Sequence, residues 1–177
     1  WSLDFLVLGY PYESLSQQKH GLCQNISRPI TSQRAYIPFG SPMMTNRFFW
    51  ELFKKEWKKY YRTPSLNEKL YLHFKGFSYI RNMEQFTGLK CLYFEGNGCK
   101  SMKGLEHCIQ MRSLFMQENM IKVIEGLDTM VELRQLNLSE NMIEKIEGIE
   151  KNVHLDTIHL KRNRIGRYKD GSVEALK

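Results

Sequence analysis

The sequence predicts a solenoid of the α/β class, in which short parallel strands stack side by side. Three observations support this fold class. An asparagine recurs at intervals of 22 residues, apolar residues recur at fixed offsets around it, and an amphipathic segment precedes the first repeat. The recurring asparagines are Asn97, Asn119, Asn141 and Asn163.

The apolar positions around each asparagine follow one frame. The residues five before it are Leu92, Leu114, Leu136 and Ile158; those three before it are Phe94, Met116, Leu138 and Leu160; and those two after it are Cys99, Ile121, Ile143 and Ile165. Two apolar residues two apart face the same side of a strand. The frame L-x-L-x-x-N-x-I is that of a leucine-rich repeat in its short 22-residue form.

The asparagine of each repeat follows the strand, where the backbone turns and loses its sheet partners. A side-chain amide can offer two donors and one acceptor to that backbone. Each buried backbone group left unpaired would cost roughly 1–3 kcal/mol. We therefore expect the four asparagines to form a structural ladder through the stack.

About five repeats are expected between residues 64 and 177. The first is degenerate, because Lys75 stands at the asparagine position. Its apolar positions are nevertheless kept, at Leu70, Leu72, Phe77 and Ile80. We expect the C-terminal end of the array to be incomplete, because Tyr168 and Gly171 break the apolar frame after the last asparagine.

An N-terminal capping helix is predicted within residues 45–63, over 46–61, to cover the open edge of the first repeat. Thr45 or Asn46 can cap it, and Thr63-Pro64 stops it. A membrane-surface helix would share the pattern. The residues expected on the buried face, opposite the lysines, are Phe49, Phe53, Trp57 and Tyr60. Residues 1–44 contain four prolines and match no repeat, so we expect an extended or disordered leader.

The charge, the apolar content and the cysteine spacing of the sequence limit the classes of function to be considered. The formal net charge of +7 is concentrated in segments 47–62 and 161–170. These segments are either solvated faces or docking sites for an acidic protein tail. Nucleic acid is not expected, because no RNA- or DNA-binding motif accompanies the charge. No apolar run is long enough to span a membrane, and the four cysteines show no metal-binding spacing, which favours a reducing compartment.

Residues between the apolar positions of each strand are predicted to point to the concave, solvent side. We expect partner binding there, unless the aromatic residues pack on each other or on the N-terminal segment. The central column is Tyr71, Tyr93, Phe115, Asn137 and His159, and the column after it contains His73, Glu95, Gln117 and Lys161. His73 and His159 lie four strands apart, roughly 19 Å, and cannot share a metal ion. No catalytic grouping or phosphate-binding loop is present, so we expect no enzyme, cofactor or metal.

Two blocks go beyond a general repeat: LYLHFKGFSYI at residues 70–80 and TGLKCL at 87–92. With them the chain resembles the leucine-rich-repeat dynein axonemal assembly factor family, from about Trp57 to about Asn163. The resemblance implies a non-enzymatic cytoplasmic factor that preassembles axonemal dynein arms for cilia or flagella. It also implies chaperones, dynein chains or other assembly factors as partners. The family's concave aromatic residues correspond to Tyr71, Tyr93 and Phe115.

Three functions remain open at this stage. The first is a monomeric scaffold or adaptor for axonemal dynein assembly, in the cytoplasm and at the cilium or flagellum. The second is a resident axonemal protein that contacts dynein or tubulin, because the basic segments suit acidic tubulin tails. The third is a phosphatase regulatory subunit, a role that similar 22-residue repeats also serve.

Overall fold

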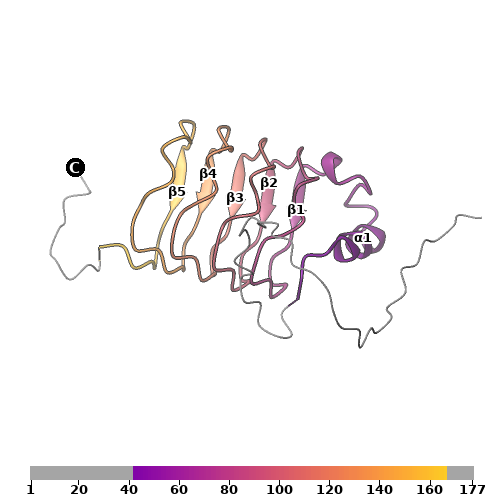
Figure 1. Cartoon of the computed structure of the whole chain (residues 1–177), viewed down its shortest axis with the longest axis horizontal. Helices are drawn as coiled ribbons and strands as arrows, with labels where there is room; N and C mark the ends of the chain where they lie inside the picture. The colour runs from indigo at the N-terminus through magenta and orange to yellow at the C-terminus, as the bar shows by residue number, and fades with distance from the viewer. Residues whose placement is uncertain (1–41, 167–177) are drawn as a thin grey trace, which may run out of the picture. The chain divides into compact units, whose positions relative to one another are not determined.

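The computed structural model describes residues 42–166; residues 1–41 and 167–177 lie outside the described part (Figure 1). Almost all of the leader expected over 1–44 therefore lies outside the described residues. The same holds for Tyr168 and Gly171, on which the expectation of an incomplete C-terminal end depended.

Helix α1 comprises Asn46–Lys55. Its N-cap is Thr45, whose Oγ1 accepts a hydrogen bond from the Phe48 backbone N–H at 3.1 Å, as expected for a threonine before a helix. Lys54 and Lys55 in the last turn lie where the helix dipole favours positive charge. The buried side of the helix is formed by Phe49, Leu52 and Phe53.

The helix is shorter than the predicted 46–61. It ends at the C-cap Glu56, whose backbone N–H donates to the Leu52 carbonyl, and residues 56–59 form a turn. Trp57 is 68% exposed, so its predicted place on the buried face was wrong. The helical spacing no longer applies once the helix has ended. The turn instead brings Tyr60 back into the core.

Five short strands form one parallel sheet in chain order. They are β1 (Lys69–Tyr71), β2 (Cys91–Tyr93), β3 (Ser113–Phe115), β4 (Gln135–Asn137) and β5 (Thr157–His159), each in the register that the repeat predicts. Between the strands the chain returns through turns and bends (Figure 1). The predicted solenoid of about 22-residue repeats, with a helix before the first strand, is confirmed.

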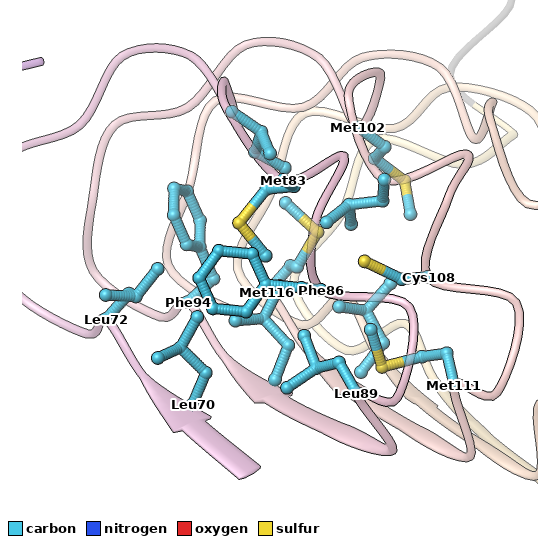
Figure 2. Packing of buried hydrophobic residues seen from close by; sticks show 14 of the residues in the cluster. Leu70, Leu72, Met83, Phe86, Leu89, Phe94, Met102, Cys108, Met111 and Met116 are labelled. Atoms are coloured by element: carbon cyan, nitrogen blue, oxygen red, sulfur yellow. The ribbon is translucent and has the colours of Figure 1, made fainter. Parts of the chain in front are cut away.

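The core lies between the sheet and the returning segments (Figure 2). Leu70, Leu92, Leu114 and Leu136 are fully buried from the strands. Met83, Phe86 and other apolar residues belong to the same core, and Figure 2 shows them packed in one cluster with Leu70 of β1. The helix joins this core at its first repeat, where the ring centroids of Phe49 and Phe86 are 4.8 Å apart.

The recurring asparagines make the hydrogen bonds that their spacing predicts. Asn119 Nδ2 donates to the carbonyls of Phe94, Met116 and Gln117 at 3.0–3.2 Å, and its Oδ1 accepts the Cys99 N–H at 2.8 Å. The amide thus joins two successive coils. The equivalent bonds recur at Asn97, Asn141 and Asn163.

The edge of the first coil is closed by two residues that the repeat frame does not identify. The Asn67 amide exchanges hydrogen bonds with the backbone of Tyr61, accepting from its N–H at 2.9 Å and donating to its carbonyl at 3.0 Å. Tyr60 Oη accepts the backbone N–H of Tyr71 at 3.2 Å. These bonds pair backbone groups that have no preceding coil to bind.

Candidate protein-binding face

The side chains that alternate with the buried strand residues form one outer surface of the sheet, here called the strand face. Its central column runs across the five strands, with one residue from each, and a second column lies two residues later in each repeat. Within the central column neighbouring side chains come from adjacent strands, about 4.8 Å apart, and within the second column they come from the segments that follow these strands. The central column is Tyr71, Tyr93, Phe115, Asn137 and His159, and the second is His73, Glu95, Gln117, Ser139 and Lys161.

Three aromatic rings of the central column form a continuous stack. The centroids of Tyr71 and Tyr93 are 4.7 Å apart with 6° between the ring planes, and those of Tyr93 and Phe115 are 4.8 Å apart with 11°. Both distances match the strand spacing, so the sheet itself sets the stack. The rings pack on each other, which was the alternative to partner binding that the sequence left open. All three rings nevertheless remain half-exposed.

Lys59, from the turn after α1, covers the free face of the first ring. Its Nζ lies 3.9 Å from the ring centroid of Tyr71 and 3.5 Å from a carboxylate oxygen of Glu56. An ammonium over a tyrosine ring is an attractive cation–π arrangement. Each ring in the stack therefore has at least one face occupied, and the edges of the rings remain for contact with solvent or a partner.

A hollow of about 590 Å³ adjoins the same end of the stack. Two large apolar side chains at its rim are well exposed, Tyr61 at 64% and Leu66 at 57%. The lining residues are Lys59, Tyr61, Leu66, Asn67, Glu68, Lys69 and Tyr71. The aromatic stack thus continues into a concave, partly apolar site.

Cys91 and Tyr93 are neighbours on the strand face. The side-chain hydrogen bond to Cys91, together with burial, raises the pKa of Tyr93 to about 12. Burial raises the pKa of the Cys91 thiol, and the hydrogen bond from Tyr93 partly opposes that rise. At neutral pH both groups are therefore uncharged, and the middle of the stack carries no formal charge.

The second column contains polar groups that lack partners. His73 Nδ1 lies 3.9 Å from Glu95 Oε1, too far for a hydrogen bond. Glu95 Oε2 and Gln117 Oε1 are shielded from solvent and, within residues 42–166, have no hydrogen-bond partner. Buried polar atoms without partners are uncommon in folded proteins. This column consequently has unused hydrogen-bonding capacity beside the aromatic stack.

The remaining predicted site residues lie at the other end of the face. Asn137 continues the central column, but its side chain is held by the segment after β4, because its Oδ1 accepts the Ser139 N–H at 3.1 Å. His159 and Lys161 are exposed on and just after β5. The structure therefore groups Tyr71, Tyr93 and Phe115 closely, and sets His159 and Lys161 apart from them.

Sequence reasoning missed the hollow and Lys59's position over Tyr71. Lys59, Tyr61 and Leu66 lie outside the repeat frame, and no periodicity marks them. The signal that could have found them is a basic, an aromatic and an aliphatic residue outside the frame, in the segment between the helix and the first strand.

Within the described residues, no group of three or more His, Cys, Asp or Glu side chains is arranged to hold a metal ion. In the same part of the chain, no helix has the length and apolar character to cross a membrane. The leucine-rich-repeat solenoid is a fold that is typically non-catalytic.

Comparison with known proteins supports the fold and a partial relationship. No family model matches the chain. Dynein axonemal assembly factor 1 of Rattus norvegicus is 54% identical over 52 residues, which is 29% of this chain and 8% of that protein. The Homo sapiens protein is 52% identical over 52 residues, covering 29% of this chain and 7% of its own length. The homolog in Drosophila erecta is 50% identical over 58 residues, or 33% of this chain and 4% of that protein.

Among solved structures, an internalin from Listeria monocytogenes matches with a TM-score of 0.52 and 20% sequence identity, covering 55% of this chain and 28% of that one. This likeness concerns the fold alone. The chain spans less than a tenth of the length of the curated relatives it matches. Fold and sequence together identify it as a leucine-rich-repeat protein related, over this segment, to dynein axonemal assembly factor 1.

Proposed function

We propose that the chain is a non-enzymatic protein-binding scaffold that acts in the cytoplasmic preassembly of axonemal dynein arms, and that its strand face holds the partner. The partial homology to dynein axonemal assembly factor 1 supports a role in dynein-arm preassembly. The partners would be axonemal dynein chains, chaperones or other assembly factors. The chain would act in the cytoplasm of cells that bear cilia or flagella.

The observation that carries the binding role is the aromatic stack of Tyr71, Tyr93 and Phe115. Aromatic side chains supply large contact area at small entropic cost and commonly anchor interfaces. Here the stack is rigid, because the strand register sets the ring spacing. A rigid anchor loses little conformational entropy when a partner binds.

The unpaired polar atoms beside the stack also support the strand face as the binding site. Glu95 Oε2 and Gln117 Oε1 have no partner among the described residues. A donor on a bound protein would supply the hydrogen bond that each oxygen lacks. A partner would then gain apolar area from the rings and directional hydrogen bonds from the adjacent column.

The test is co-purification from the cytosol of ciliated cells, with the chain as bait. Tyr93→Ala/Phe115→Ala should lose dynein and assembly components that wild type recovers. Trp50→Ala/Trp57→Ala is the matched control, because it removes two exposed aromatic residues that belong to α1 and the turn after it and not to the strand face. Circular dichroism and thermal melting verify that each variant is folded at the assay temperature.

Equal recovery by wild type and the strand-face variant would count against the proposal. Fractionation separates this role from that of a resident axonemal protein. A cytoplasmic pool supports preassembly, whereas a signal confined to salt-extractable axonemes would contradict it.

A further inference from the structure

The two edges of the strand face carry different charge. The edge where the strands begin, here called the strand-start edge, contains Glu68, Lys69, Lys90, Arg112, Arg134 and Asp156. Lys90 is hydrogen-bonded to Glu68, and Arg134 Nη1 lies 3.9 Å from Asp156 Oδ2. Lys69 and Arg112 have no carboxylate at ion-pair distance within residues 42–166. This edge therefore has uncompensated positive charge.

Three further acidic residues lie on the opposite side of the aromatic stack. Glu95 and Glu118 follow strands β2 and β3, and Glu140 follows β4, where it pairs with Arg162 at 2.9 Å. A rigid stack of rings separates them from Lys69 and Arg112. Beside the three rings, a ligand would meet Lys69 and Arg112 on one flank and Glu95 and Glu118 on the other; Lys161 also lies on the second flank, but at the far end, after β5.

The hollow lies at the strand-start side of the stack. Lys69 lines it together with the exposed Tyr61 and Leu66. Its acidic residue, Glu68, is already held by Lys90, and this bond lowers the pKa of the Glu68 carboxyl. The hollow thus offers an apolar seat beside an unpaired ammonium group.

The rings favour the same kind of ligand. Both faces of Tyr71 and Tyr93 and one face of Phe115 are occupied by neighbouring rings or by Lys59, so a partner reaches mainly the ring edges. The edge of an aromatic ring is the positive part of its quadrupole. Oxygen acceptors are therefore better matched to this surface than cations.

From these relations we propose that the strand face takes a segment of a partner protein that sets carboxylates along the strand-start edge and an apolar side chain in the hollow beside Tyr71. This inference rests on the proposed function, because it specifies the chemistry of the partner that the strand face would bind. The segment is an acidic one in which aspartate or glutamate neighbours leucine or an aromatic residue.

Selection of phage-displayed random linear peptides on the full chain tests this chemistry without a known partner. Selected peptides are synthesised with a fluorophore, and their affinity is measured by anisotropy. The test variant is Lys69→Glu/Arg112→Glu. The control is Lys100→Glu/Lys122→Glu, which makes the same change in net charge at two exposed residues outside the strand face.

Peptides enriched in acidic residues next to leucine or aromatic residues are expected. Their affinity should fall at least about tenfold in the Lys69/Arg112 variant, because each reversal places like charges together. It should also weaken with added salt. The Lys100/Lys122 control should retain wild-type affinity, which separates local pairing from a general effect of net charge.

Selection of basic or uncharged peptides, or the absence of any enrichment, overturns the inference. So does affinity that survives the Lys69/Arg112 reversal. The same assay also tests the proposed function separately, through the loss of binding in Tyr93→Ala/Phe115→Ala. Peptides that are insensitive to charge reversal but lost with Tyr93→Ala/Phe115→Ala leave the strand face as the binding site and reject only its acidic ligand.

Discussion

The hydroxyl oxygen of Tyr60 accepts a hydrogen bond from the backbone N–H of Tyr71 at 3.2 Å. Tyr71 ends the first strand and starts the aromatic stack, so this bond ties the segment after the helix to the edge of the sheet. Tyr60 is 5% exposed, and burial raises the pKa of its hydroxyl to about 12. Helix α1 and the segment that follows it thus complete the edge of the sheet by hydrogen bonding as well as by covering apolar surface.

Replacement of Tyr60 by phenylalanine is expected to lower the free energy of unfolding by about 1–3 kcal/mol, because the Tyr71 N–H loses its partner while the ring remains in the core. Chemical denaturation measures the change. Tyr61→Phe is a suitable control, since that side chain is 64% exposed and its loss of a hydroxyl should be nearly neutral. If both variants unfold alike, the bond contributes nothing.

Asn119→Ala should destabilise the chain more than Asn163→Ala. The first change leaves three carbonyls and the Cys99 N–H without the amide in a buried site, and the expected cost is at least about 2 kcal/mol. Asn163 is half-buried, so water can take over part of its bonds. Thermal melting compares the two, and shifts of equal size would contradict this ordering.

Gly104→Ala is expected to cost more stability than Gly98→Ala. Both glycines have a left-handed backbone, with φ of +104° and +83°. An added Cβ at Gly104 would lie 2.6 Å from the Ile80 carbonyl oxygen, whereas nothing lies within 4 Å at Gly98. The backbone strain is common to both, so the difference between their unfolding free energies reports the close approach of two coils. A reversed order would mean that the coils can shift apart easily.

Stability should fall as the solution becomes alkaline. Burial raises the pKa of the Cys108 thiol to about 12, above its unfolded value of about 8.5. The folded state therefore favours the protonated thiol, and its contribution is present below pH about 8.5 and is lost as pH rises toward about 12. Unfolding by denaturant at neutral and alkaline pH measures the loss. In Cys108→Ala the dependence on pH should be weaker; an unchanged dependence would assign the effect to other groups.

Most of the repeat architecture is predictable from sequence because it depends on local periodicity. The spacing of two in L-x-L places Leu92 and Phe94 on one side of a strand, and the interval of 22 brings Asn97 and Asn119 into register. The aromatic column follows from the same register. The length of the helix could not be predicted from periodicity, because the end of α1 depends on the turn that returns Tyr60 to the core.

Sequence alone thus determined the solenoid, the amide ladder and the alignment of three aromatic residues, since each repeats at one interval along the chain. Only the tertiary structure decided that the rings stack face to face, that Lys59 covers Tyr71, and that a hollow opens beside Lys69. The last two features join residues from the segment after α1 to residues of the repeats. Their contacts depend on how the chain turns after the helix, and no periodic pattern encodes that turn.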